Sequence, residues 1–136
     1  MSVVNALNTV LFSRLAGGTA LINTLGGTFI YYQQAPDNAA RPYVVWSYQA
    51  GQQENITPSR MFNELVYIRG YSDNQAQAGT IDAQVNTLVD GYAFSASGHT
   101  NFWTARESEF SMFDVLPDST KVYMAGAMYR VRLSKD

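Results

Sequence analysis

Residues 62–89 read FNELVYIRGYSDNQAQAGTIDAQVNTLV, a strand that continues directly into a helix. From Phe62 to Tyr71, apolar side chains occupy positions on both faces, which is typical of a strand covered on both sides. The period then becomes helical, with a capping box at Ser72 and Gln75 and an apolar stripe at Ala78, Ile81, Val85 and Leu88. Gly91 supplies the stop. Because the stripe is narrow and the opposite face is polar, we expect this helix to lie on a sheet.

Two further helices are predicted near the N-terminus. Ser2 is a candidate N-cap and Gly17 a stop for the first helix, whose apolar residues at helical spacing are Val4, Leu7, Val10, Leu11 and Leu15. A shorter helix is predicted from Thr19 to Leu25, because Gly26-Gly27 follows it as a stop. Together they predict a helical hairpin.

The segments between these helices and residue 62 favour strands and loops. Phe29 to Tyr32 is β-branched and aromatic, and Tyr43 to Tyr48 is apolar on both faces, as in a central strand. Ala50 to Arg60 is polar and contains a glycine and a proline, which predicts an exposed loop. We expect this loop to contact a partner protein through the adaptable polar side chains of Gln52, Gln53, Glu54, Asn55 and Arg60.

The last third of the chain is strand-like. Tyr92 to Phe94 predicts a short strand, followed by a Ser-Gly loop through His99. Phe102 to Phe113 and Lys121 to Leu133, joined by a turn, predict a long final hairpin. In the last strand one set of alternate residues is apolar, and the other set begins apolar and ends basic.

This order of elements predicts an α+β fold with a mostly antiparallel sheet of four to five strands and helices packed on one face. We expect a single domain over residues 1–136. The other face of the sheet would lack cover within the protomer, and would be available to neighbours. The residues of the final hairpin that we expect between subunits are Phe110, Met112, Tyr123, Met124, Met128 and Tyr129.

The composition limits the kind of partner. The chain has no cysteine, which excludes disulfides, thiolate zinc sites and cysteine nucleophiles. Its start lacks a signal-peptide pattern and no apolar run approaches the ~20 residues of a membrane helix, so we expect a soluble, cytoplasmic protein. A formal net charge of -2 does not favour binding to a polyanion.

Catalytic and metal-binding interpretations find little support. The single histidine, His99, is predicted in a loop without a nucleophile motif, and the acids show no ligand-like spacing, so we expect no enzyme activity, no metal and no cofactor. Glu107 and Glu109 are predicted to share one face of a strand and could work as a carboxylate pair, but Arg106 and Lys121 offer them hairpin partners, which favours a structural role. A minor hypothesis is a basic strip that contacts phosphate or an acidic surface, formed by Arg106, Arg130 and Arg132.

The sequence resembles the tail terminator, or tail completion, proteins of long-tailed, siphovirus-like bacteriophages. The resemblance covers nearly the whole chain and rests on pattern, with no catalytic motif. The segments that carry it are the helix ending Arg14-Leu15, residues 20–31, Arg41-Pro42-Tyr43-Val44-Val45, Phe62 to Ala76, the Ile81 to Val89 helix and the final Tyr129-Arg130-Val131-Arg132-Leu133.

The resemblance implies a structural virion protein that forms a hexameric ring on the tail tube. Such a ring would end tube growth, join the tail to the head, and let DNA pass without specific binding. Its partners would be further copies of itself, the tail tube protein and a neck or head-completion protein, in the host cytoplasm during assembly and then in the virion.

Two alternatives remain open from the sequence. One is a head-completion or neck protein of the same virion, which would have a similar size. The other is a small ligand-binding α+β domain, which would be favoured by a concave pocket lined by Trp46, Tyr48 and Trp103.

Overall fold

Five strands form one sheet in the computed structural model, which describes residues 3–55, 60–94 and 97–135. The order across the sheet is β1-β2-β3-β5-β4. β1 is parallel to β2, and the other three pairs are antiparallel, which confirms the prediction of a mostly antiparallel sheet. The elements are α1 (Val3–Ala16), α2 (Thr19–Leu25), β1 (Ile30–Tyr32), β2 (Tyr43–Asn55), β3 (Arg60–Ser72), α3 (Gln75–Val89), β4 (His99–Val115) and β5 (Lys121–Lys135).

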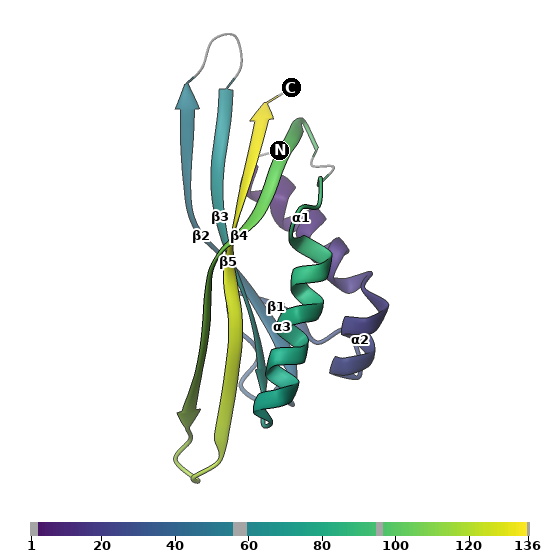
Figure 1. The fold of residues 1–136 in the computed structure, drawn as a ribbon, viewed down its shortest axis with the longest axis vertical. Helices are drawn as coiled ribbons and strands as arrows, with labels where there is room; N and C mark the ends of the chain where they lie inside the picture. Colours follow the sequence, from purple (N-terminus) through teal and green to yellow (C-terminus); the bar gives the residue numbers. More distant parts are fainter. Residues whose placement is uncertain (1–2, 56–59, 95–96, 136) are drawn as a thin grey trace.

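The three helices lie on one face of the strongly twisted sheet (Figure 1), as the sequence predicts for an α+β fold. α3 lies against β3 and β5. α1 and α2 both pack against α3 on the same side of the sheet. Gly70 of β3 makes room for the Ile81 side chain of α3, since a Cβ at that position would collide with it. One apolar core results, and its fully buried members include Leu7, Leu11, Leu15, Leu21, Ile68, Ile81, Val131 and Leu133.

The N-terminus of α3 is capped by Asn74 and not by Ser72. The Asn74 Oδ1 atom accepts hydrogen bonds from the backbone N–H groups of Ala76, at 2.8 Å, and Gln77, at 3.2 Å. Ser72 is buried and belongs to β3; its hydroxyl accepts the Asn74 N–H and donates to the Gln77 side chain. The predicted capping box at Ser72 and Gln75 is therefore wrong. The N-cap lies two residues later, at Asn74, and asparagine is as good an N-cap as serine.

The β2–β3 hairpin is longer than predicted. Antiparallel pairing continues to Asn55 and Arg60, so most of the expected exposed loop is ladder. Backbone pairing with a neighbouring strand satisfies the N–H and C=O groups whatever the side chains, which allows Gly and Gln to extend a strand. The expected loop is thus wrong for residues 50–55 and 60, and residues 56–59 lie outside the described part of the chain.

The segment before β4 also differs from the prediction. Tyr92 to Phe94 forms no strand: the Tyr92 N–H donates to the Val89 carbonyl in a turn, and the N–H of the buried Phe94 donates to a side chain, Asn101 Oδ1. β4 begins at His99, a residue that the sequence pattern predicted in a loop. Two irregularities interrupt its pairing with β5, one between residues 101 and 103 and one between 106 and 108.

Glu64 is a carboxylate buried on the helix side of β3. Its residue is 2% exposed, and its Oε2 atom has no hydrogen-bond partner among the residues that the structure describes. Gly51 lies opposite in the ladder and leaves the space that the carboxyl group fills. Desolvation raises the pKa of Glu64 from 4.5 to about 7.

Candidate assembly surface

No helix or strand of the described chain covers the side of the sheet opposite the helices (Figure 1), although residues 33–37 line a hollow there with Tyr43, Val45, Arg69 and Tyr71. Register and alternation place residues of four strands in rows on this side, for example Tyr43, Tyr71, Met124 and Met112. Most of these side chains are half-buried, and Met112 is 55% exposed. We call this surface the open face and define it as Tyr31, Tyr43, Val45, Tyr67, Arg69, Tyr71, Phe110, Met112, Met124 and Met128.

Aromatic rings contact one another across the strands of the open face. Tyr43 lies between Tyr31 and Tyr71, with ring centroids 5.8 and 5.2 Å away. Tyr67 of β3 stacks on Phe110 of β4 at 4.7 Å with an interplanar angle of 5°, although β5 lies between them. Gly126 of β5 has no side chain to separate the two rings, and any Cβ there would collide with the β3 backbone. The result is two groups of packed rings on the open face, Tyr31–Tyr43–Tyr71 and Tyr67–Phe110.

Arg69 places a positive charge in the middle of the open face. Its guanidinium lies 4.8 Å from the Tyr67 ring centroid and 5.9 Å from that of Tyr71. Its Nε atom is buried and has no hydrogen-bond partner within the described ranges. Tyr-x-Arg-x-Tyr in one strand puts all three side chains on one face, so this pattern is a signal in the sequence that could have predicted the cluster.

The six predicted interface residues do not share one surface. Phe110, Met112, Met124 and Met128 belong to the open face, and their role between subunits stays a prediction. Tyr123 lies on the helix side beyond α3, where its ring is 6.1 Å from that of Phe113.

Tyr129 is wrong as an interface residue, because it is completely buried beneath α3. Its hydroxyl accepts a hydrogen bond from Arg106 Nη1 at 3.0 Å, and it donates to Asn86 Oδ1 of α3 at 3.4 Å. Burial raises the pKa of Tyr129 to about 12. The residue therefore holds the helix to the sheet.

The predicted basic strip does not form. Arg106 points to the helix side and binds both carboxylate oxygens of Asp82 in α3, at 3.0 and 2.7 Å. Arg130 lies on the opposite side of the sheet, where it binds Glu107 and donates to Asn63 Oδ1 at 2.7 Å. Arg106 is thus separated from Arg130 and Arg132 by the sheet, and the charges of Arg106 and Arg130 are compensated within the protomer.

Glu107 and Glu109 do not form a carboxylate pair. The irregularity between residues 106 and 108 changes the alternation, so Glu107 binds Arg130 and Glu109 binds Arg106 on the other side of the sheet. Hydrogen bonds from Arg130 lower the pKa of Glu107. Both acids therefore have structural partners, as the favoured interpretation predicted. Arg106 is one of these partners, but the other is Arg130, and Lys121 contacts neither acid in the described ion pairs.

The alternative chemical sites also come apart in the fold. The Nδ1 atom of His99 lies 2.8 Å from the Ser97 carbonyl oxygen, and its ring packs edge-on against Phe62. Trp46 is buried under the helices and Trp103 is 46% exposed on β4, with two strands between β2 and β4, so they do not line one pocket. Within the described ranges no three His, Asp or Glu side chains gather as metal ligands, and no helix is long and apolar enough to cross a membrane.

The residues predicted to contact a partner from the 50–60 loop belong to the tip of the β2–β3 hairpin instead. Gln52 pairs with Asn63, Gln53 with Phe62, and Asn55 with Arg60. Glu54 pairs with Met61 in the same ladder. A partner at this tip remains a prediction.

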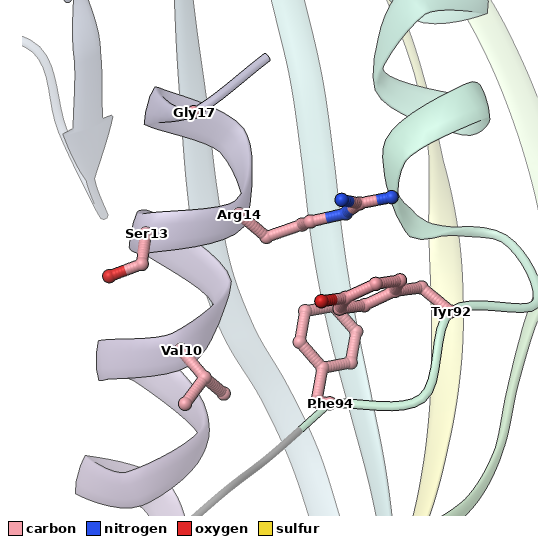
Figure 2. A pocket seen from close by; sticks show the side chains of 6 residues that line it. All are labelled: Val10, Ser13, Arg14, Gly17, Tyr92 and Phe94. Atoms are coloured by element: carbon pink, nitrogen blue, oxygen red, sulfur yellow. The ribbon is translucent and has the colours of Figure 1, made fainter.

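A hollow of about 320 Å³ lies on the helix side, between α1 and the segment after α3 (Figure 2). Val10, Tyr92 and Phe94 provide its apolar walls, and Arg14 crosses it. The Arg14 guanidinium lies over the Tyr92 ring, 3.7 Å from its centroid, and its Nε donates to the Leu88 carbonyl at 2.8 Å. No local pattern predicts this hollow, because its parts are about 80 residues apart along the chain.

Comparison with known proteins agrees with the fold and identifies the family. A component of a structure described as the virion of a native gene transfer agent particle superposes with a TM-score of 0.80 at 18% identity, over 98% of each chain. A second solved chain superposes with a TM-score of 0.59 at 11% identity, over 96% of each. No curated protein sequence gives a significant match. The family model of tail completion protein gp17 matches residues 9–131, and the chain therefore belongs to that family of structural phage tail proteins.

Proposed function

We propose that this protein forms a ring at the head-proximal end of a phage tail, where it ends growth of the tail tube and provides the surface on which the head is joined. Membership of the tail completion family supports a structural role in the tail. The observation that carries the proposal is the open face, an aromatic and methionine surface that no helix or strand of the described chain covers.

A ring is the assembly that this surface favours. Tyrosine, phenylalanine, methionine and arginine are enriched in protein interfaces, and all four occur together on the open face. The helix side carries a different surface, so a contact between the two sides of neighbouring copies is heterologous, and such contacts close into rings when the rotation permits. Six copies are proposed from the family resemblance.

The ring would contact the tail tube on one side and a neck or head-completion protein on the other, with DNA passing through its centre. Near-neutral net charge suits that passage, because a channel with many unpaired cations would retain the phosphates it must release. We propose that one domain of 136 residues does this, assembling in the host cytoplasm and remaining at the head–tail junction.

Met124→Asp tests the ring. Met124 is half-buried on the open face, so an aspartate there would place a charge in the proposed interface with little effect on the core. We expect the mass of the purified protein in solution, measured by light scattering, to fall from the ring to the protomer. Met124→Leu, which keeps an apolar side chain at the same position, is the matched control and should leave the mass unchanged.

A second experiment tests the place in the virion. In cells infected by a phage that lacks this protein, electron microscopy should show abnormally long or unjoined tails beside filled heads. Met124→Asp should fail to restore normal tails, and Met124→Leu should restore them. Heads that leak DNA beside tails of normal length would instead assign the protein to head completion.

A further inference from the structure

The end of the β4–β5 hairpin carries an unusual set of exposed side chains. It extends past α3 at the bottom of Figure 1. Met112, Phe113 and Val115 are 55%, 59% and 52% exposed. Register places Asp114 on the same side of β4 as Met112, whereas Phe113 and Val115 face the other side. Asp114 accepts the N–H of Val115 and takes part in no ion pair with the described residues. The open-face side of this end therefore combines the apolar Met112 with the Asp114 carboxylate, and a second acid, Asp118, lies in the turn.

The hollow beside α1 has the complementary character. Arg14 is fixed by its hydrogen bond to Leu88 and by the Tyr92 ring, and no described carboxylate lies within ion-pair distance of it. The walls around it are apolar (Figure 2), and Tyr92 is 38% exposed. A cation held in place beside apolar walls fits a carboxylate that lies beside an exposed apolar side chain, as Asp114 lies beside Met112.

These two surfaces cannot meet within one protomer. The hairpin end lies at the bottom of the view in Figure 1, whereas α1 lies in its upper half, on the helix side. A contact between them must join two copies, and it must be heterologous because the two surfaces differ.

We propose that the β4–β5 hairpin end of one copy docks into the α1 hollow of a second copy. The Asp114 carboxylate accepts hydrogen bonds from the Arg14 guanidinium, and Met112, on the same side of β4, packs against the apolar walls of the hollow. This inference rests on the proposed ring and names the surface that receives the hairpin.

The docked hairpin would be one part of a larger interface. Stable interfaces bury about 1,000 Å² or more in total, which a hairpin end alone does not supply. Met112 and Met124 continue the apolar surface from the hairpin end onto the open face, and both line a hollow of about 490 Å³ there. The Asp114–Arg14 pair would fix the register of the contact, while the apolar residues supply most of its free energy.

Charge reversal tests the pairing. Purified full-length protein would carry Asp114→Arg, Arg14→Glu, both changes together, or Asn23→Arg, at an exposed position of α2 outside both surfaces, as the control. Light scattering over a dilution series would give the concentration at which the ring dissociates. We expect each single reversal to raise that concentration about tenfold or more, the combined variant to recover most of the loss, and the control to match the wild type.

A second variant separates folding from docking. Arg14→Glu also removes the hydrogen bond to Leu88, so thermal unfolding of each variant is measured alongside. Met112→Ser changes an exposed side chain on the docking side of the hairpin, and it should weaken the ring without lowering the unfolding temperature.

Rings that dissociate at the wild-type concentration in both Asp114→Arg and Met112→Ser would overturn the inference and leave the ring itself standing. The inference would also be overturned if the ring of the combined variant dissociated at a concentration as high as that of the less stable single variant. Normal rings of these variants that fail to join tails would assign the hairpin end to the tube or neck protein instead. A wild-type protein that stays monomeric would overturn the ring and the docking together.

Discussion

Replacing Glu64 by glutamine should change how the stability of this protein depends on pH. The Glu64 carboxyl group is buried on the helix side of β3 and its Oε2 lacks a partner among the described residues, so the folded state favours the protonated form. Its pKa rises from 4.5 to about 7. Each pKa unit corresponds to about 1.4 kcal/mol, so the shift of roughly 2.5 units corresponds to about 3 kcal/mol.

The sign follows from which state keeps the proton. Below about pH 4.5 Glu64 is protonated in both the folded and the unfolded chain, and its contribution is fully present. Between pH 4.5 and about 7 the unfolded chain loses the proton while the folded chain keeps it, so the free energy of unfolding falls as the pH rises. Above about pH 7 the loss is complete, and the folded protein contains a buried charge.

Glu64→Gln removes this titration and keeps the side-chain shape. Urea unfolding, followed by tryptophan fluorescence from pH 4.5 to 9 at one protein concentration, gives the free energy of unfolding for both proteins. We expect the variant to gain about 3 kcal/mol on the wild type between the acidic and the basic end of this range. Asp37→Asn, which changes an exposed carboxylate, is the control and should give a curve parallel to the wild type. If the Glu64→Gln curve also ran parallel to the wild-type curve, the raised pKa of Glu64 would be refuted.

Two further substitutions test the helix layer. Arg106→Leu leaves the Asp82 carboxylate, which is only 19% exposed, without its partner. It should lower the free energy of unfolding by roughly 3 kcal/mol in the same urea assay. A change below about 1 kcal/mol would show that solvent screens the pair. Gly79→Ala should raise the free energy of unfolding by about 1 kcal/mol, because Gly79 lies inside α3, is exposed, and has open space where a Cβ would stand; no gain would mean that the helix surface is not free.

The helices and the central strands were predictable from the sequence because each has a clear period. Gly26 ends α2 in a left-handed conformation, as a C′ glycine should, and Ala78, Ile81 and Val85 of α3 are buried as predicted, with Val89 buried in place of Leu88. The tip of the β2–β3 hairpin was missed because backbone pairing, which any residue type can make, extends the two strands. Side-chain patterns carry no signal for such an extension.

The distribution of residues between the two sides of the sheet was only partly predictable. Alternation placed Met124 and Met128 together correctly, but Tyr129 was included among interface residues although it alternates with them and faces the helices. The irregularity between residues 106 and 108 changes which side of the sheet the neighbouring side chains face. A bulge of this kind has no reliable signature in a single sequence. The Arg14 hollow depends on tertiary contacts and could not be predicted from local patterns.

β4 ends the sheet on one side, and its outer edge has consequences for the protein before it assembles. An unpaired edge with exposed Trp103, Met112 and Phe113 invites strand addition from other chains, which begins aggregation. The two irregularities in β4 and the charged side chains around Arg106 oppose such growth, because a bent, charged edge does not accept a regular new strand. The same features therefore limit aggregation of free protomers through this edge.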